Sequence, residues 1–212
     1  MKTIGIFGGT FSPVHNGHLR MALELKQHLV LDEMRLVPAH QPPHRSEEGV
    51  SSLQRLKMVE LAIDDCMELT IDSRELNRDC ASYTVDTLSS LRGELGSDVS
   101  LVLCMGMDSF LSLPSWHRWE ELLSLAHIAV AARPGWELPE SGKMLDFFQK
   151  HVGTAADFQN APAGKIVVET LTLLPISATA IRKQIQQGLS PMYLLPKNVW
   201  KYIQQQNLYG AE

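Results

Sequence analysis

A short apolar run that stops at two glycines and leads into an amphipathic helix is the feature that most constrains this chain. The run Thr3-Ile4-Gly5-Ile6-Phe7 is unbroken, which is typical of a strand buried on both faces of a parallel sheet. From about Asn16 onward, Leu19, Ala22 and Leu29 recur at helical spacing and place an apolar stripe on one face. The chain therefore opens with a strand, a turn and a helix, as α/β proteins do.

The turn between the strand and the helix has the layout of a site for nucleotide phosphate. Gly8 and Gly9 can turn sharply and let backbone N–H groups approach a ligand, while Pro13 stiffens the exit from the turn. The helix N-terminus points at this turn, and its unpaired amides and positive dipole end attract anions. His15 and His18 are three residues apart, so both imidazoles can face the same place from the first helical turn.

Other motifs that bind phosphate or metal fit this segment less well. The turn lacks the Gly-Lys-Ser/Thr ending of a P-loop, and the spacing of Gly8, Gly9 and Gly17 differs from the dinucleotide fingerprint Gly-x-Gly-x-x-Gly. A zinc helix would carry His-Glu-x-x-His, and no cysteine lies close to His15 and His18 in the sequence. We therefore expect no metal held by these histidines, and the simplest alternative is that both only cap the helix.

Apolar runs and helical patterns alternate along the whole chain. We expect strands at 3–8, 34–38, 69–73, 99–105, 127–132 and 166–173, with helices near 16–30, 51–67, 83–95, 116–125 and 142–151. Such βα repetition builds a Rossmann-like, doubly wound parallel sheet that binds ligands beyond the carboxyl ends of its strands. We expect one domain, 1–212, with a Rossmann-like core over 1–175 and a C-terminal helical section over 176–212. The helices of that section are expected near 177–187 and 196–206.

Composition narrows the class of protein and of partner. At 212 residues the chain can bury a sizeable core, and its 44% apolar content includes no run long enough to span a membrane. The net charge of −5 argues against a nucleic-acid partner, because non-specific binding to nucleic acid depends on basic surface. The three cysteines, Cys66, Cys80 and Cys104, are odd in number and widely spaced, which favours a reducing cytoplasm.

The segment Ile176-Ser177-Ala178-Thr179-Ala180-Ile181-Arg182 is a second candidate for phosphate binding. Ser177 is a good N-cap, Thr179 falls in the first helical turn, and Arg182 follows one turn later. Hydroxyls, backbone amides and a guanidinium could therefore converge on an anion. The alternative is plain capping. However, an Arg near a helix N-terminus opposes the helix dipole, and a bound polyphosphate would explain its place.

Motifs spread over nearly the whole chain resemble those of one enzyme family. Residues 8–18 read Gly-Gly-Thr-Phe-x-Pro-x-His-x-Gly-His, which resembles the signature of the nucleotidyltransferase superfamily with a His-x-Gly-His motif. Within this superfamily the chain most resembles the bacterial nicotinate-nucleotide adenylyltransferases. The other motifs that carry the resemblance are Pro42-Pro43-His44-Arg45, Ser82-Tyr83-Thr84, Gly106-Met107-Asp108-Ser109, Trp116, Arg133-Pro134-Gly135 and the segment 176–182. One position departs from the pattern: the family usually has Asp where this chain has Ser12, so a hydroxyl must shape the turn here.

The resemblance implies transfer of the adenylyl group of ATP to nicotinate mononucleotide, which gives deamido-NAD and pyrophosphate in NAD biosynthesis. His15 and His18 would donate hydrogen bonds to the ATP phosphates, and Arg182 would be the third catalytic group. Mg²⁺ would arrive with ATP, held by phosphates and waters. The residues expected to bind ATP are Gly8, Gly9, Thr10, Phe11, His15, His18, Gly106, Asp108, Ile176, Ser177, Thr179 and Arg182.

The acceptor side is expected to combine an aromatic face with hydrogen-bond donors. A pyridine ring with a carboxylate could stack on Trp116 and accept hydrogen bonds from amides near Thr84 or His117. In the family the loop that corresponds to 42–45 contacts substrate phosphate, and phosphate contact is also favoured for Arg133. The residues expected to bind nicotinate mononucleotide are Thr10, His44, Arg45, Tyr83, Thr84, Trp116, His117 and Arg133.

Each of these assignments has a structural alternative. The basic residues of the 42–45 loop could be solvated surface charges, and Arg133 could form a structural ion pair. Trp116 could pack in the core, and Asp108 could cap a short helix at 109–113 instead of accepting from a ribose.

Two other functions stay open at this point. The acceptor could be nicotinamide mononucleotide or phosphopantetheine, or the reaction could be a cytidylyl transfer. A sensor that binds nucleotide without turnover belongs to another class, and Ser12 is the residue that hints at it. Pyrophosphate release in the presence of each acceptor would separate these functions.

Overall fold

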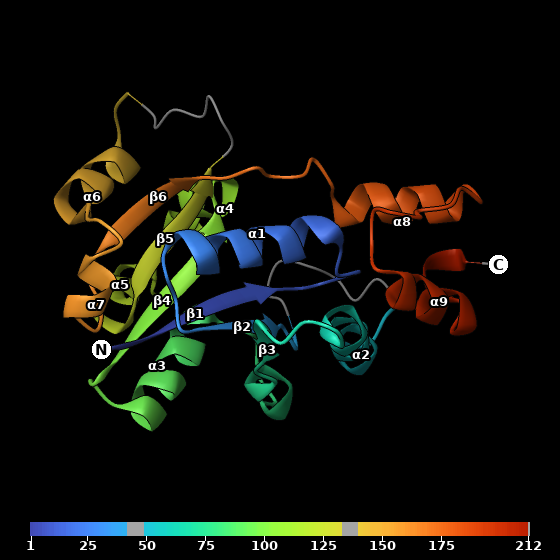
Figure 1. The fold of residues 1–212 in the computed structure, drawn as a ribbon, viewed down its shortest axis with the longest axis horizontal. Helices are drawn as coiled ribbons and strands as arrows, with labels where there is room; N and C mark the ends of the chain where they lie inside the picture. The colour runs from blue at the N-terminus through green and yellow to red at the C-terminus, as the bar shows by residue number, and fades with distance from the viewer. Residues whose placement is uncertain (42–48, 133–139, 212) are drawn as a thin grey trace.

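The described residues form one six-stranded, all-parallel β-sheet that is flanked by helices (Figure 1). The structure is a computed structural model, and it describes residues 1–41, 49–132 and 140–211. The strands are β1 (Lys2–Gly9), β2 (Glu33–Pro38), β3 (Leu69–Ile71), β4 (Val99–Gly106), β5 (His127–Ala132) and β6 (Ile166–Thr170). Their bounds agree with the expected strands to within three residues, which confirms the predicted α/β class.

The strand order places a crevice at the centre of the sheet. The order β3-β2-β1-β4-β5-β6 is doubly wound. From β1 to β3 the chain builds outward to one edge of the sheet, and from β4 to β6 it builds outward to the other edge. β1 pairs with β2, where Gly8 lies opposite Val37, and with β4, where Ile6 lies opposite Leu103. Sheets of this kind bind ligands where the order reverses, beyond the carboxyl ends of those two strands. Here that place lies beyond β1 and β4.

The helices follow the expected pattern with one exception. The α-helices of the described ranges are α1 (Asn16–His28), α2 (Ser52–Ile63), α3 (Thr84–Leu95), α4 (Met107–Leu111), α5 (Leu122–Leu125), α6 (Lys143–His151), α7 (Asp157–Asn160), α8 (Ala178–Gln186) and α9 (Lys197–Gln205). Short 3₁₀ helices are η1 (Arg74–Asn77), η2 (Leu113–Ser115), η3 (Trp119–Glu121) and η4 (Leu208–Gly210). The expected helices that agree to within two residues are those at 16–30, 83–95, 142–151, 177–187 and 196–206. The helix expected at 51–67 is confirmed but ends at Ile63.

The single helix expected at 116–125 is wrong. Trp116 has an extended backbone, Arg118 takes a left-handed conformation with φ of 51°, and helix is limited to η3 and α5. A left-handed residue interrupts the i→i+4 hydrogen bonds, so no continuous helix can cross it. The short helix expected at 109–113 also begins earlier, at Met107 of α4.

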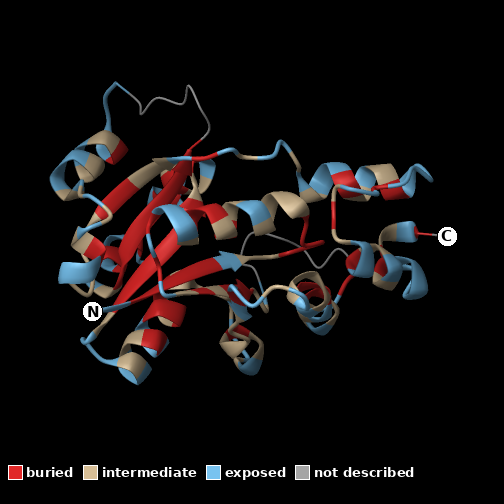
Figure 2. Cartoon of the chain, viewed as in Figure 1, coloured by how far each residue is buried: buried red, intermediate tan, exposed pale blue. Residues whose placement is uncertain are grey.

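Both faces of the sheet are buried, which is why the central strands read as continuous apolar runs. On β1, Ile4 and Ile6 pack into one core cluster together with Leu88 of α3. Phe7 packs into the other cluster together with Leu25 of α1. Figure 2 shows the strands as a buried layer between the helices.

The C-terminal helices close one end of the molecule. α8 and α9 lie at the end toward which β1 runs (Figure 1). Ile181 of α8 and Val199 of α9 are fully buried in the core cluster that α1 also joins. The last helices are therefore part of the packed core and lie near the carboxyl ends of the strands.

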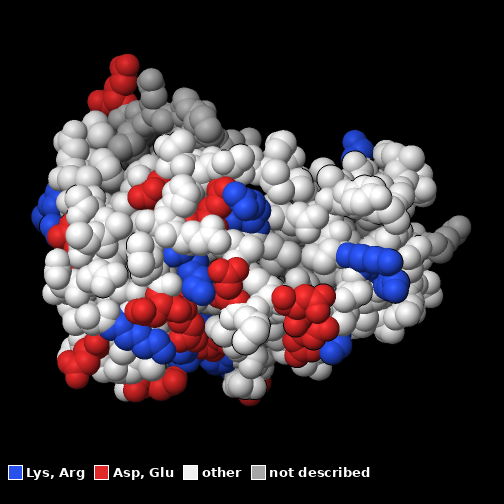
Figure 3. All heavy atoms as spheres, viewed as in Figure 1, with Lys and Arg blue, Asp and Glu red and all other residues white. Residues whose placement is uncertain are grey.

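The charge pattern of one face and the character of the helices describe the outside of the molecule. On the face drawn in Figure 3, acidic and basic side chains are intermixed. Among the described ranges, no helix has the length and apolar character needed to cross a membrane.

Candidate functional site

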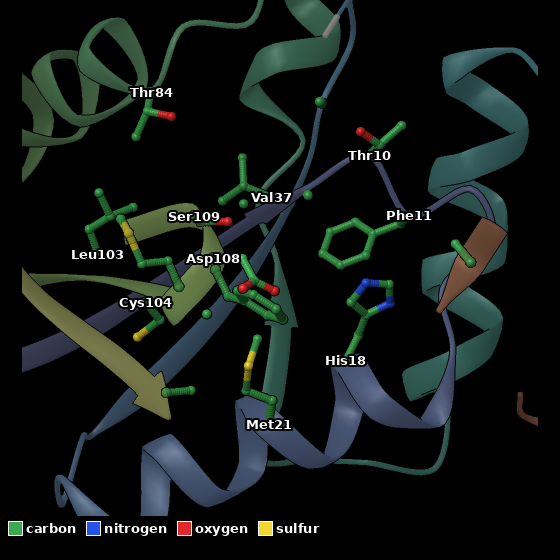
Figure 4. A pocket seen from close by; sticks show the side chains of 18 of the residues that line it. Thr10, Phe11, His18, Met21, Val37, Thr84, Leu103, Cys104, Asp108 and Ser109 are labelled. Atoms are coloured by element: carbon green, nitrogen blue, oxygen red, sulfur yellow. The ribbon is translucent and has the colours of Figure 1, made fainter. Parts of the chain in front are cut away.

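A pocket of about 610 Å³ lies beyond the carboxyl ends of β1 and β4. The ends of β1, β2 and β4, the starts of α1 and α3, and the segment 173–179 form its walls. Figure 4 shows Phe11 and His18 on one side of it and Asp108 and Ser109 on another. The predicted site residues that line the pocket are Gly8, Gly9, Thr10, Phe11, His15, His18, Tyr83, Thr84, Gly106, Asp108, Trp116, His117, Ile176, Ser177 and Thr179. The fold thus gathers residues from segments far apart in the sequence.

The chain turns later than the sequence indicated. Gly8 and Gly9 are the last residues of β1, and the turn falls at Ser12 and Pro13, after Phe11 with φ of 51°. A Cβ on Gly9 would lie 2.9 Å from the ring of Phe11, whereas a Cβ on Gly8 would meet nothing within 4 Å. Packing therefore explains the glycine at 9. The glycine at 8 borders the open space of the pocket.

His15 and His18 form a stacked imidazole pair at the N-terminus of α1. Their ring centroids are 3.6 Å apart, at an interplanar angle of 17°. The Nδ1 atom of each ring accepts the backbone N–H of the other residue at 3.3 Å, which makes a reciprocal cap on the helix. Accepting through Nδ1 requires a neutral ring that carries its proton on Nε2. The two histidines therefore do cap α1, and the same hydrogen bonds fix the Nε2–H tautomer of both rings, which line the pocket.

Burial sets the charge state of His15. The residue is 4% exposed, and burial lowers the pKa of its imidazole to about 4. The ring is therefore neutral near neutral pH, and its Nε2–H can donate to an anion. The glycine at position 17 leaves room for the stacked rings, because a Cβ at this position would lie 3.1 Å from Nδ1 of His15.

The second predicted phosphate segment reaches the same loop. Ser177 caps α8 by accepting the backbone N–H of Ala180 at 3.1 Å, as expected. Arg182 donates from Nη1 to the backbone carbonyl of Ser12 at 2.7 Å and from Nη2 to Oγ1 of Thr179 at 3.4 Å. Arg182 is not among the residues that line the pocket. The helix dipole disfavours a positive charge near the N-terminus of α8. The hydrogen bond to the carbonyl of Ser12 helps to explain why the Arg182 guanidinium is nevertheless found there.

Tyr83, Thr84, Trp116 and His117 form a part of the pocket lining that is here called the aromatic wall. Tyr83 precedes α3, and its ring packs against that of His117 with centroids 4.3 Å apart. Thr84 is the first residue of α3 and lines the pocket with Trp116, which is half-buried. Trp119 is 8% exposed and belongs to the core. Of the two neighbouring tryptophans, Trp116 is therefore the one that a ligand can reach.

Asp108 presents its carboxylate to the pocket without capping a helix. Gly106 at the end of β4 is the N-cap of α4, and no side chain forms a capping hydrogen bond there. Asp108 lies in the first turn of α4 and is exposed. The capping interpretation of this carboxylate is therefore wrong.

Sequence reasoning missed a buried polar pair on the pocket wall. Glu75 of η1 is 7% exposed and accepts a hydrogen bond from Oγ1 of Thr87 of α3 at 2.6 Å. Burial raises the pKa of the Glu75 carboxyl. Cys104 of β4 also lines the pocket, and burial raises the pKa of its thiol to about 12. Glu75 and Thr87 look like ordinary polar residues in the sequence, so only the tertiary fold could identify them.

Three predicted acceptor residues, His44, Arg45 and Arg133, lie outside the described residues. Their assignments, and the surface-charge and ion-pair alternatives, therefore stay predictions.

Comparison with known proteins identifies the family. A family model for cytidylyltransferase-like proteins matches residues 6–184. A probable nicotinate-nucleotide adenylyltransferase of Cellvibrio japonicus (strain Ueda107) is 55% identical, covering 98% of each chain. One of Hahella chejuensis (strain KCTC 2396) is 48% identical, covering 98% of this chain and 96% of the relative. The chain belongs to the nicotinate-nucleotide adenylyltransferases of the cytidylyltransferase-like family.

A solved structure supports the fold of this adenylyltransferase. The Plasmodium falciparum nicotinic acid mononucleotide adenylyltransferase complexed with NaAD superposes with a TM-score of 0.79. The match covers 100% of this chain and 99% of that chain at 18% sequence identity. The doubly wound architecture of the adenylyltransferase is thus shared at low sequence identity.

The pocket of the adenylyltransferase offers few side chains that could ligate a metal ion. Within the described ranges, no group of three or more His, Cys, Asp or Glu could hold a metal ion. Mg²⁺ is commonly held by substrate phosphates, waters and one or two carboxylates. Asp108 offers the pocket an exposed carboxylate of this kind.

Proposed function

We propose that this chain transfers the adenylyl group of ATP to nicotinate mononucleotide, with deamido-NAD and pyrophosphate as products. The observation that carries the chemistry is the neutral imidazole pair of His15 and His18 at the N-terminus of α1, beside the open backbone of Gly8. The names of relatives at 55% and 48% identity support the choice of acceptor. The pocket volume of about 610 Å³ falls in the range typical of small-molecule sites.

The reaction asks little covalent chemistry of the protein. The 5′-phosphate oxygen of nicotinate mononucleotide forms a bond to the α-phosphorus of ATP. The bond from that phosphorus to the oxygen bridging to the β-phosphate breaks, and its electron pair leaves with pyrophosphate. The attacking oxygen is already anionic near neutral pH, so no general base is needed. Catalysis then consists of positioning and charge stabilisation.

The histidine pair and the C-terminal segment act on the triphosphate. In the proposal, His15 and His18 donate from Nε2 to phosphate oxygens, and His18 is closest to the charge that develops on the leaving group. Backbone N–H groups after Gly8 and the first turn of α8 with Thr179 add further donors. Arg182 is kept as the proposed third catalytic group, although it donates to the Ser12 carbonyl and is not among the residues that line the pocket. Mg²⁺, when bound with ATP, neutralises phosphate charge. The ATP-binding assignments of the sequence analysis are kept as proposals.

The aromatic wall holds the acceptor. The pyridine ring stacks on Trp116, and amides near Thr84 and His117 donate to its carboxylate. His44, Arg45 and Arg133 are kept as proposed phosphate contacts.

The proposed compartment is the reducing cytoplasm, because the three cysteines form no disulfide with one another. The net charge of −5 is unsuited to broad nucleic-acid binding, so phosphate recognition is local to the pocket.

Pyrophosphate release tests the proposed reaction directly. The protein is assayed with MgATP and, in turn, nicotinate mononucleotide, nicotinamide mononucleotide and phosphopantetheine. We expect the highest kcat/KM with nicotinate mononucleotide. A higher value with another acceptor contradicts the acceptor assignment, and no release with any of them contradicts catalysis.

Removal of one imidazole tests the role of the histidine pair. We expect His18→Ala to lower kcat by about 10²–10³-fold, which is typical of losing one donor to a transition state. The matched control is His28→Ala at the other end of α1, where the imidazole is exposed and lies 3.5 Å from Glu169. The control should retain the wild-type rate. A His18→Ala enzyme within a few-fold of wild type would contradict this role.

A further inference from the structure

Side chains from three distant elements hold the turn that follows β1, here called the 10–13 loop (residues 10–13). Arg55 of α2 is 4% exposed and donates from Nη1 to the carbonyl of Thr10 at 2.8 Å. Arg182 of α8 donates to the carbonyl of Ser12 at 2.7 Å. Tyr209 of η4 contacts the side chain of the same Ser12, with the two hydroxyl oxygens 2.9 Å apart. The C-terminal section therefore grips Ser12 by both its backbone and its side chain.

The held residue is itself part of the pocket wall. Ser12 is 5% exposed and lines the pocket. A buried hydroxyl that lost its partner would be costly, so the contact with Tyr209 is a specific requirement of this position. Where the family resemblance places Asp at position 12, this chain meets the phenol with a hydroxyl instead.

Phe11 connects the held loop to the histidine pair. It takes a left-handed conformation with φ of 51°, which a bulky residue keeps only where its surroundings impose it. Its ring is 2% exposed and meets the imidazole of His18 edge-on, with centroids 5.2 Å apart (Figure 4). A shift of Ser12 would move Phe11, the residue immediately before it, and with it the ring against which His18 packs.

We infer that Tyr209 is a positioning residue of this enzyme: through Ser12 and Phe11, its hydroxyl sets the imidazole of His18 in the pocket. This inference rests on the proposed function, in which His18 stabilises the transition state. The device couples the C-terminal end of the described chain to the first turn of the fold, a link that no local motif reveals.

The test removes the contact from either side. Tyr209→Phe deletes only the phenol oxygen, and Ser12→Ala deletes only the hydroxyl and leaves the carbonyl that Arg182 uses. Each should lower kcat about tenfold and change KM for ATP less than about twofold, because the donor is misplaced rather than removed. In the double variant kcat should fall about as much as in either single variant, because both substitutions remove the same contact between the hydroxyls of Ser12 and Tyr209. The matched control is Tyr202→Phe on α9, a half-buried tyrosine of the same core cluster that is not among the residues lining the pocket.

A second measurement does not depend on turnover. The imidazole Cε1–H proton resonance of His18, assigned by its absence in His18→Ala, should shift in Tyr209→Phe and Ser12→Ala but keep its place in Tyr202→Phe. Urea unfolding establishes that each variant is folded under the assay conditions. An unmoved resonance with wild-type kcat in Tyr209→Phe, or a double loss equal to the product of the single losses, overturns the inference. If the wild-type enzyme released no pyrophosphate, the proposed function would fail, while the resonance would still report whether Tyr209 positions His18.

Discussion

At the scale of single residues, structural and functional readings of the same side chain are compatible here. The histidine pair caps α1 through Nδ1, and the same hydrogen bonds leave the ring protons on Nε2. Helix capping and the proposed binding of phosphate therefore use different atoms of His15 and His18. The sequence could show the spacing of the pair but not its reciprocal geometry, because that geometry depends on the extended backbone of His15.

His15 should make the protein less stable in mild acid. The unfolded chain takes up its proton near pH 6.5, whereas burial lowers the folded pKa to about 4. The stability linked to a neutral ring is fully present above pH 6.5 and is lost as the pH falls toward 4, by up to about 3 kcal/mol. Urea unfolding at pH 7.5 and pH 5 measures the part of this loss that falls above pH 5, about 2 kcal/mol. His15→Asn, which keeps an N-cap residue without a titrating ring, should show a smaller loss, and an unchanged loss would contradict the assignment to His15.

Alanine at the last two glycines of β1, Gly8 and Gly9, should separate ligand approach from packing. A Cβ on Gly8 meets nothing in the protein, so Gly8→Ala should change the free energy of unfolding by less than about 0.5 kcal/mol. The same methyl group would obstruct a phosphate at the backbone, so we expect KM for ATP to rise about tenfold. A Cβ on Gly9 overlaps the ring of Phe11, and Gly9→Ala should cost about 1–3 kcal/mol of stability. Equal stability losses in both variants would contradict this separation.

At the scale of elements, the sequence predicted what burial controls and missed what tertiary contacts control. The strands were predictable because both faces are buried, so each strand appears as an unbroken apolar run. The segment 116–125 has the composition of a helix, yet Arg118 is left-handed and the segment splits. The sequence predicts the turn after β1 at Gly8 and Gly9, but the chain turns later, at Ser12 and Pro13. A sequence does not show that Gly9 is a glycine because the ring of Phe11 packs against it. The proposed division at residue 175 stays a prediction.

One arginine should hold several elements together far from the pocket. Arg92 of α3 donates to the carbonyls of Val99 at 2.7 Å, Leu125 at 2.7 Å and Pro162 at 2.9 Å. A lysine cannot reproduce this fork of donors, so Arg92→Lys should lower the free energy of unfolding by about 2 kcal/mol. Val99 begins β4, at the end of the strand away from the pocket, so kcat should be unchanged.

The control for this variant is Arg118→Lys, whose ion pairs are exposed and screened by solvent, so this substitution should change the free energy of unfolding much less than Arg92→Lys does. Urea unfolding compares the two substitutions. An equal effect of both on stability would show that the carbonyl contacts of Arg92 have no special weight.

At the scale of the whole molecule, the pocket forms where the sheet meets the C-terminal helices. Gly8 and His18 come from the first unit of the fold, and Ser177 and Thr179 come from the start of α8, yet all line one cavity. Helix N-termini from two parts of the chain therefore face the same space. This arrangement suits a ligand whose negative charge is concentrated in one group. Because the protein as a whole has a net charge of −5, the attraction for such a group must come from the pocket itself.

Thermal unfolding with a series of ligands tests that arrangement. A ligand at 100 times its Kd stabilises the folded state by about 2.7 kcal/mol, or roughly 5–10 °C in a chain of this size. Because the proposed grip is on phosphate, we expect the shift in Tm to increase from adenosine to AMP to MgATP at equal concentration. His18→Ala should shrink the increment between AMP and MgATP more than it shrinks the shift with adenosine. If adenosine stabilised the protein as much as MgATP does, the nucleoside would supply the binding energy, and the histidine pair would have to be assigned to capping alone.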